Sequence, residues 1–308
     1  MTTFLYTHQA CLEHDTGAYH PERADRLRSV LKALRAEAFA GLDRLEAPRA
    51  TREHLMLAHP QGHVDHVLGS VPEEGLVMID ADTVVCPESG EAALRAAGAV
   101  VAAVDAVISG QARNAFCATR PPGHHAEADQ ALGFCLFNNV VIAARHAQQA
   151  HGLRRVAIMD FDVHHGNGTQ HLLEHDSSCL YASTHQMPLY PGTGDRHERG
   201  VGNIINAPLS PDSGSATFRA AMENTILPAI RTFDPELVLI SAGFDAHQND
   251  PLGGLNLVAE DFGWATLKLC QIAADCCDGR VVSTLEGGYD LDALGECSAA
   301  HVAALMAA

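Results

Sequence analysis

Short segments that are apolar at every position constrain the fold of this chain more than any other feature. Residues 156–159 and 237–240 are two such segments, and aspartate and glycine follow each of them within a few positions. A strand that is apolar on both faces belongs in a parallel sheet that helices cover on both sides. We therefore predict one α/β domain over residues 1–308, with three layers (α/β/α) and a mainly parallel central sheet.

Strand-like and helix-like patterns alternate along the whole chain. The predicted strands are residues 3–6, 115–118, 155–161, 179–184, 237–241 and 281–285, and the predicted helices are residues 21–38, 88–109, 138–151, 213–233, 259–278 and 291–306. We expect Pro228 to kink or end its helix, because proline lacks the N–H that a helix needs. Ligands of open α/β sheets bind beyond the carboxyl ends of the strands, so polar motifs that follow these strands mark the candidate site.

The composition excludes several classes of protein. The 308 residues include 38 acidic and 20 basic ones, a net charge of −18, which argues against nucleic-acid partners because these need a basic surface. The acidic surface favours solubility, with attraction of cationic substrates as the alternative. No run approaches the roughly 20 apolar residues of a membrane helix, and no secretory signal is recognised, so we expect a cytoplasmic protein without membrane partners. The nine cysteines are scattered, which argues against a disulfide framework or a cysteine zinc site.

The motif Asp-Phe-Asp-Val-His-His-Gly-Asn-Gly at 160–168 ends the predicted strand at 155–161. Strand side chains alternate between faces, so Asp160, Asp162 and His164 share one face. Two carboxylates this close repel each other, a divalent cation resolves the conflict, and imidazole is a usual ligand of such a cation. The motif therefore predicts a metal site, and a polar turn is the alternative.

Asp245 follows the strand at 237–241 in the same way and is a natural third ligand. Three protein ligands leave one position open for water, which is typical of catalytic rather than structural metal sites. His247 is near enough in sequence to reach the same ion, but we favour a role at the rim or in the structure.

Two more motifs follow predicted strands. His124 and His125 end an Arg-Pro-Pro-Gly-His-His segment, and they are extra metal ligands, a general acid–base pair or part of a polar loop. Tyr289 ends a Glu-Gly-Gly-Tyr segment, and its phenol is placed to donate to a developing oxyanion, although a tyrosine after glycines is usually a packing residue. The loops at 133–139 and 189–195 are rich in glycine and aromatic residues, and either wall a channel or pack as loops.

Together these motifs resemble the histone deacetylase superfamily, whose members have the arginase–deacetylase fold. The set is His-Pro-Glu-Arg at 20, Arg-Pro-Pro-Gly-His-His at 120, Gly-Phe-Cys at 133, Asp-x-Asp-x-His-His-Gly-Asn-Gly at 160, Pro-Gly-Thr-Gly at 191, Ser-Ala-Gly-Phe-Asp at 241 and Glu-Gly-Gly-Tyr at 286. The resemblance spans roughly residues 19–307, and the short chain is similar to bacterial class II-like histone deacetylase-like amidohydrolases. It implies a hydrolase that removes acetyl or other short acyl groups from acyl-lysine or related acylated amines.

The resemblance also implies a role for each matching residue. Zn²⁺, or Fe²⁺ in its place, would be held by Asp162, His164 and Asp245. His124 and His125 would flank the attacking water with Asp160 and Asn167 as their partners, and Tyr289 would bind the substrate carbonyl. A structural K⁺ would use Asp160, Asp162, Ser183 and the carbonyls of His164 and Thr184. The channel residues would be His20, Pro21, Gly133, Phe134, Tyr190, Leu252 and Gly287, and Arg26 matches an arginine in the family's internal cavity.

Two positions depart from parts of that family. Class I members have aspartate where this chain has Asn167, and a neutral partner does not hold a proton on imidazole as a carboxylate would. We therefore expect His125 to act as a neutral general base and later as the acid, with His124 as electrostatic support. Members specialised for acetylpolyamines carry a glutamate at the position of Leu252, which disfavours a polyamine substrate.

Other functions stay open at this stage. One is hydrolysis of acetylpolyamines, small amides or esters at the same site, and another is a catalytically weak domain that binds acyl-lysine. A two-metal ureohydrolase is disfavoured, because such enzymes have aspartate two residues after the metal-binding histidine, where this chain has Gly166. The expected partner is an acylated lysine peptide or a small acylated amine. The sequence leaves the oligomeric state open, and the bacterial relatives often form dimers or tetramers.

Overall fold

The computed structural model describes residues 2–308. Eight strands form one sheet in the order β2-β1-β5-β10-β9-β6-β7-β8, and every neighbouring pair in it is parallel. A separate antiparallel pair joins β3 (Val77–Met78) to β4 (Val84–Val85). The predicted parallel sheet is confirmed. Its strands are β1 (Thr3–Thr7), β2 (Asp43–Glu46), β5 (Asn114–Cys117), β6 (Val156–Asp160), β7 (Cys179–Gln186), β8 (Ile204–Leu209), β9 (Leu237–Ala242) and β10 (Val281–Leu285).

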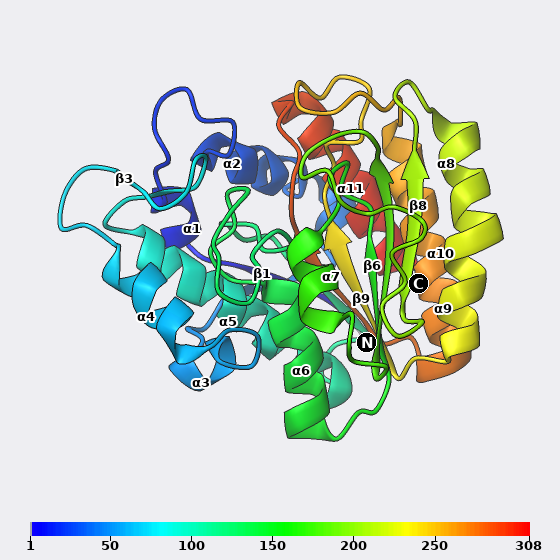
Figure 1. Cartoon of the computed structure of the whole chain (residues 1–308). Helices are drawn as coiled ribbons and strands as arrows, with labels where there is room; N and C mark the ends of the chain where they lie inside the picture. The colour runs from blue at the N-terminus through cyan, green and yellow to red at the C-terminus, as the bar shows by residue number, and fades with distance from the viewer. Residues whose placement is uncertain (1) are drawn as a thin grey trace.

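Helices cover both faces of the sheet, so the molecule has three layers (Figure 1). One face carries α3 (Arg52–Leu55), α4 (Gln61–Gly69), α5 (Ser89–Ile108), α6 (Asn139–His151) and α7 (Asn167–Leu173). The other face carries α2 (Ala24–Ala33), α8 (Ser215–Ala221), α9 (Leu227–Phe233), α10 (Ala259–Cys277) and α11 (Leu291–Ala307). The short helix α1 (Ala10–Glu13) contacts both α2 and α5.

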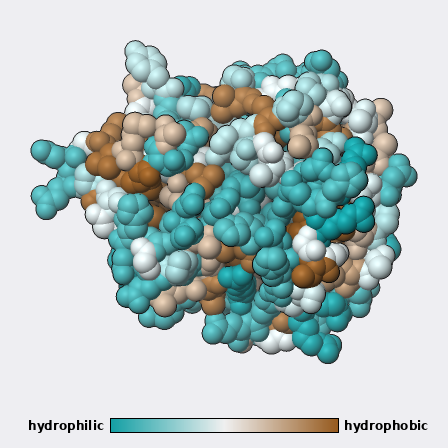
Figure 2. Space-filling view, in the orientation of Figure 1, coloured by the Kyte–Doolittle hydropathy of each residue, from teal (hydrophilic) through white to brown (hydrophobic). Residues whose placement is uncertain are grey.

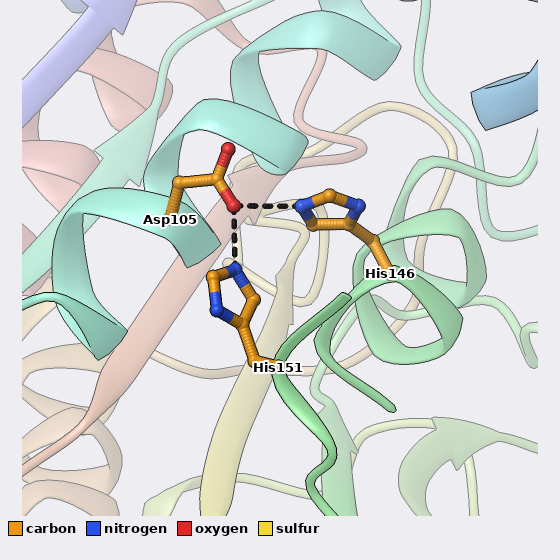
Figure 3. A group of neighbouring side chains, drawn as sticks. All are labelled: Asp105, His146 and His151. Carbon is orange, nitrogen blue, oxygen red and sulfur yellow. Dashed lines mark hydrogen bonds and ion pairs between the residues drawn. The ribbon is translucent and has the colours of Figure 1, made fainter. Parts of the chain in front are cut away.

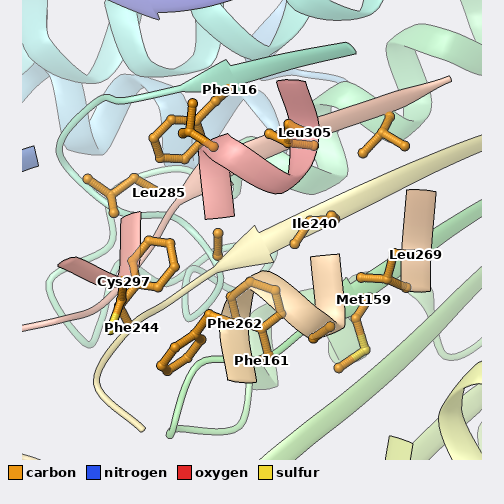
Figure 4. Packing of buried hydrophobic residues seen from close by; sticks show 14 of the residues in the cluster. Phe116, Met159, Phe161, Ile240, Phe244, Phe262, Leu269, Leu285, Cys297 and Leu305 are labelled. Carbon is orange, nitrogen blue, oxygen red and sulfur yellow. The ribbon is translucent and has the colours of Figure 1, made fainter. Parts of the chain in front are cut away.

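The central strands are buried along their whole length. Every residue of β6, β7, β9 and β10 is buried, which explains why β6 and β9 begin with four apolar residues in succession. Beyond the strand ends, Phe161 and Phe244 pack against Phe262 of α10, with ring centroids 5.7 and 5.3 Å apart (Figure 4). Because these phenylalanines alternate with the aspartates of the two loops, their packing fixes the loops that carry the polar motifs.

Edge strands explain two omissions from the sequence prediction. The strand β2 is charged and largely exposed, as edge strands often are, and its pattern does not alternate. The strand β8 contains Pro208, which is tolerated at an edge because one side of the strand needs no partner. Neither segment has the apolar run that identifies the central strands.

Two predicted helices differ from the observed ones. The helix predicted over residues 21–38 is shorter: α2 begins after Arg23, where the chain is extended, and ends at Ala33, and Glu37–Phe39 form a separate 3-10 helix. The helix over residues 213–233 is continuous but contains a π-helical turn, Met222–Ile226, directly before α9. Pro228 lies in the first turn of α9, so the wider turn before it accommodates the missing N–H donor.

The surface is mainly hydrophilic with several apolar patches, one of them on the side where β3 lies (Figure 2). Leu76, Val77 and Met78 are exposed there, Met78 by 62%. Among the helices of residues 2–308, none combines the length and apolar character needed to cross a membrane.

Candidate active site

Five neighbouring strands deliver the motifs to one edge of the sheet. The strands β5, β10, β9, β6 and β7 lie side by side, and each is followed by one of the polar segments that the sequence singles out. Their carboxyl ends point the same way because all are parallel (Figure 1). Segments more than 160 residues apart, such as those at 123 and 286, therefore meet in one place.

Asp162, His164 and Asp245 form one compact group of buried side chains. Each offers one ligand atom, and these atoms lie within 4.8 Å of one another. The Nδ1 atom of His164 is 3.1 Å from Asp162 Oδ1 and 3.2 Å from Asp245 Oδ2. The other oxygens of the two carboxylates accept backbone N–H bonds, from Gly287 at 2.8 Å to Asp162 Oδ2 and from Val163 at 2.8 Å to Asp245 Oδ1. The backbone therefore holds both carboxylates toward His164.

The donor set fits a divalent cation. Asp245 Oδ2 is buried and makes no hydrogen bond among the described residues, although His164 Nδ1 lies 3.2 Å away. Burial and the charge of Asp162 raise the pKa of Asp245 to about 7, because two buried carboxylates face each other. Burial by itself would lower the pKa of His164, but the same carboxylates raise it to about 10, so the two carboxylates favour a positive charge at this point.

Glycine is required where these carboxylates meet the backbone. A β-carbon on Gly287 would overlap both Asp245 and Asp162, and one on Gly243 would overlap Asp162. A β-carbon on Gly133 would likewise press on the ring of His125. The glycines of these motifs thus leave room for the side chains of the site rather than only for a turn.

His124 and His125 lie side by side, with ring centroids 4.0 Å apart, but their partners differ in charge. His124 Nδ1 is 2.9 Å from Asp160 Oδ2, whereas His125 Nδ1 is 2.8 Å from the amide oxygen of Asn167. Burial opposes the charged form of both rings; Asp162 and Asp160 outweigh it and raise the pKa of His124 to about 10. The pKa of His125 falls well below its ordinary value, through burial and the neighbouring His124 and His164. The pair therefore combines a cationic and a neutral imidazole.

Glu127, which the sequence analysis did not identify, fixes the orientation of Asn167. The amide nitrogen of Asn167 donates to Glu127 Oε1 at 2.7 Å, so its oxygen must face His125. An amide oxygen only accepts, hence His125 carries its proton on Nδ1 and leaves Nε2 free to act as a base. His171 approaches the other oxygen of Glu127 at 3.0 Å on the exposed side. No local motif marks Glu127, because the contacts of its side chain are 40 or more residues away in sequence.

Tyr289 is held from two sides. Its backbone N–H donates at 2.7 Å to Asp250, whose other oxygen accepts the N–H of Leu252. The guanidinium of Arg26 lies 4.7 Å from the centre of the Tyr289 ring and donates to the carbonyls of Glu286 and Gly288. Burial raises the pKa of the phenol well above 10, so it remains a hydrogen-bond donor at neutral pH.

Aromatic rings from separate loops adjoin this group. Phe134 lies between His20 and Tyr289, with centroid distances of 4.7 and 6.0 Å, and Tyr190 lies 5.1 Å from His125. Phe134 has a φ of 68°, a left-handed conformation that is rare for a bulky residue and is often found at functional sites. Of the other residues predicted to line a channel, Pro21 and Leu252 are half-buried, and Gly133 and Gly287 adjoin His125 and the carboxylates.

The residues predicted to hold K⁺ lie at the carboxyl ends of β6 and β7 and in the loop after β6. Asp160 and Ser183 are paired in register on β6 and β7, and Thr184 is the next residue along β7. All of these residues are buried, and Asp160 also accepts from the phenol of Tyr181 at 3.1 Å. His247 does not belong to the three-residue ligand group and adjoins Asp250 in the following turn.

The His-Pro-Glu-Arg segment, which locally reads as a helix start, supplies a buried ionic network. Glu22 binds Arg120 through both oxygens and Arg26 at 2.9 Å, and all three side chains are fully buried. Arg120 begins the loop of His124, and Arg26 contacts Tyr289. The network therefore joins the supports of two site loops, which the isolated segments do not reveal.

Comparison with known proteins identifies the family. The histone deacetylase domain matches residues 20–305. A histone deacetylase-like amidohydrolase from Pseudomonas aeruginosa is 39% identical over 277 residues, which are 88% of this chain and 72% of that protein. This chain belongs to the histone deacetylase superfamily. A probable deacetylase from Archaeoglobus fulgidus is 37% identical over 299 residues, covering 95% of this chain and 82% of that protein.

A solved structure agrees with this assignment. The HD domain of HDA15 matches with a TM-score of 0.94 and 34% identity, over 99% of this chain and 88% of that one. The fold is therefore the arginase–deacetylase fold of histone deacetylases, as predicted from the motifs. Membership supports deacetylase-type hydrolysis in a family that generally depends on a metal.

Proposed function

We propose that this histone deacetylase homologue is a zinc-dependent amidohydrolase that removes acetyl or other short acyl groups from acyl-lysine or related acylated amines. The supporting observation is the convergence of Asp162, His164 and Asp245 beside two histidines, of which His124 pairs with a carboxylate and His125 with an amide. Zn²⁺ bound by these three residues would polarise the acyl carbonyl and lower the pKa of water, to about 7 in well-studied sites.

The side chains divide the remaining chemistry. His125, neutral and with Nε2 free, takes a proton from the attacking water and later returns it to the leaving amine. His124, charged beside Asp160, stabilises negative charge that develops on the substrate. Tyr289 donates to the oxyanion, and the surrounding rings of Phe134 and Tyr190 are suited to an apolar stem such as that of lysine.

Charge near the entrance supports an amine-derived substrate. Asp82 adjoins the aromatic loops, because its Oδ1 accepts the N–H of Gly133 at 3.1 Å and its carbonyl lies 3.0 Å from His20 Nε2. Its negative charge attracts basic peptides and polyamines alike. Leu252 supplies no carboxylate to recognise an internal amine of a polyamine, so we favour acyl-lysine. We infer K⁺ at Asp160, Asp162, His164, Ser183 and Thr184 as a structural ion.

A substrate panel tests this proposal. Zinc-loaded protein is incubated with acetyl-lysine peptides, acetylpolyamines and simple esters, with the acyl chain varied, and the released acid is measured with and without a chelator. We expect release from acyl-lysine that a chelator and a hydroxamate both abolish. Binding of the peptide without release would favour the catalytically weak domain instead, and faster release from acetylpolyamines would contradict the preference for lysine.

Loss of the Glu127 carboxylate should reduce turnover through Asn167. In Glu127→Ala the amide of Asn167 is free to flip and present its nitrogen to His125. We therefore expect kcat to fall about 10- to 100-fold, as is typical when a residue that orients a site ligand is removed. Glu127→Gln still accepts from Asn167 and should retain most of the activity. The matched control is His171→Ala, which removes only the outer contact of Glu127. Equal losses in Glu127→Ala and His171→Ala, or unchanged kcat in Glu127→Ala, would contradict this role.

A further inference from the structure

A second group of metal-type ligands lies far from the catalytic loops. Asp105 extends from the last turn of α5, and His146 and His151 extend from the second half of α6 (Figure 3). The opposite end of α6 adjoins the loop of His124, where Asn139 binds the carbonyl of Pro121. From Asn139 to His151 the helix spans about 18 Å, so the two ligand groups are separate sites.

The two histidines converge on a single oxygen atom. His146 Nε2 is 2.7 Å and His151 Nε2 is 2.6 Å from Oδ1 of Asp105. The Asp105 side chain is 51% exposed, whereas those of His146 and His151 are 10% and 25% exposed. The group is therefore anchored by the buried His146, whereas His151 lies at the surface and the carboxylate of Asp105 is open to solvent and free to adjust.

The charge around this group favours a cation. The carboxyl ends of α5 and α6 both carry the negative end of a helix dipole, and Asp105 adds a formal negative charge at that end of α5. Within residues 2–308, the only ion pairs of Asp105 are those with the two histidines. The neighbouring Arg145 is directed elsewhere, because its guanidinium donates to the carbonyls of Leu57 and Leu172.

His54 of α3 is adjacent but is held in another role. Its ring lies 5.3 Å from that of His146, and its Nδ1 accepts the backbone N–H of Thr51 as part of a helix cap. That bond places the proton of a neutral His54 on Nε2, which then has no lone pair for a metal. The ligand set is thus two imidazoles and one carboxylate.

We propose that Asp105, His146 and His151 bind a divalent transition-metal ion such as Zn²⁺, which clamps the carboxyl ends of α5 and α6 together. Two imidazoles and a carboxylate suit Zn²⁺, Ni²⁺ and Cu²⁺ rather than Mg²⁺ or Ca²⁺, which prefer oxygen ligands. Water completes the coordination on the exposed side.

The geometry requires only a small adjustment. The present distances of 2.6 and 2.7 Å are those of hydrogen bonds, whereas tetrahedral Zn²⁺ ligands about 2.0 Å from the ion lie ~3.3 Å apart. A rotation of the half-exposed Asp105 side chain provides the difference, and each imidazole moves its proton from Nε2 to Nδ1. A carboxylate that merely bridges two imidazoles by hydrogen bonds is the rival, and it predicts no metal affinity.

Metal binding with the catalytic ligands disabled tests the proposal. The Asp245→Asn protein is dialysed against Zn²⁺ and its metal content is measured, and Cu²⁺ is then added to record the electron paramagnetic resonance of imidazole-bound copper. We expect one ion per chain, histidine coordination in the spectrum, and at least about a hundredfold weaker binding after Asp105→Asn is added, because losing a ligand costs more than losing its support. Asparagine still accepts a hydrogen bond, so circular dichroism should show an intact fold.

The matched control is His175→Ala in the same Asp245→Asn background. His175 is an exposed histidine 3.5 Å from Glu174 and belongs to neither ligand group, so its loss should leave the metal content unchanged. The proposal is overturned if the Asp245→Asn protein binds no ion, or if an ion remains bound with the same affinity after Asp105→Asn. Because the readout is metal content and not turnover, failure here leaves the proposed hydrolase function intact.

Discussion

Tyr289→Phe should lower turnover on an acetyl-lysine peptide by about 10²–10³, the typical cost of removing one donor to an oxyanion. The hydroxyl makes no hydrogen bond to another group among residues 2–308, so its loss should leave stability and metal content nearly unchanged. The ring itself stays packed between Arg26 and Phe134 in the phenylalanine variant. The measurement is kcat by acetate release, together with the melting temperature and the bound metal.

Tyr19→Phe is the matched control for this experiment. Tyr19 is fully exposed, so the same chemical change there should alter neither kcat nor stability. Near-normal kcat in Tyr289→Phe would refute the role of the phenol. A clearly lower melting temperature of Tyr289→Phe would instead indicate that the hydroxyl stabilises the fold.

Glu22→Gln should produce the largest loss of stability. The carboxylate is fully buried between Arg120 and Arg26, and removing one partner of a buried ionic group typically costs about 3–5 kcal/mol, because the remaining charges stay buried without compensation. Activity should fall as well, because Arg26 supports the backbone on both sides of Gly287 and contacts Tyr289. The free energy of unfolding in urea measures the effect.

The pKa of Glu22 determines how the difference in unfolding free energy between wild type and Glu22→Gln depends on pH. Burial alone would raise the pKa of Glu22, but Arg120 and Arg26 outweigh it and lower the pKa from 4.5 to about 2. The lowered pKa means that the carboxylate stabilises the fold above pH 4.5 and loses this effect as pH falls toward 2. We therefore expect the gap between wild type and Glu22→Gln to be constant near neutral pH and to shrink in acid.

Asp25→Asn, three residues further along the chain and in the first turn of α2, provides the comparison. Asp25 is half-exposed and pairs with Arg28 at 2.9 Å on the surface, where an ion pair contributes only about 0–1 kcal/mol. A similar loss of stability in Asp25→Asn and Glu22→Gln would contradict the buried network. So would a difference in unfolding free energy between wild type and Glu22→Gln that stays the same in acid.

The sequence predicts those parts of the structure whose cause is local. The central strands are recognisable because both of their faces are buried, and the candidate ligands because they directly follow strands β6 and β9. The partnership of His125 with Asn167 was expected only through the family resemblance, and the hydrogen bond between them is present.

What the sequence does not predict depends on contacts between distant segments. Glu127 orients Asn167 across 40 residues, and Glu22 meets Arg120 across 98 residues. Asp105 and His146 are unremarkable on their own helices and form a ligand group only when α5 packs on α6. Edge strands such as β8 are missed because several of their side chains are only partly buried, so no continuous apolar run marks them in the sequence.

The most direct test of the central claim is acetate release from an acetyl-lysine peptide during a zinc titration of metal-free protein. We predict no release without metal and recovery as Zn²⁺ is added. Asp245→Asn should show no recovery, because it replaces the carboxylate whose Oδ2 atom makes no hydrogen bond and would face the ion. Full turnover by the metal-free protein, or normal recovery in Asp245→Asn, would contradict a hydrolase that depends on an ion held by Asp162, His164 and Asp245.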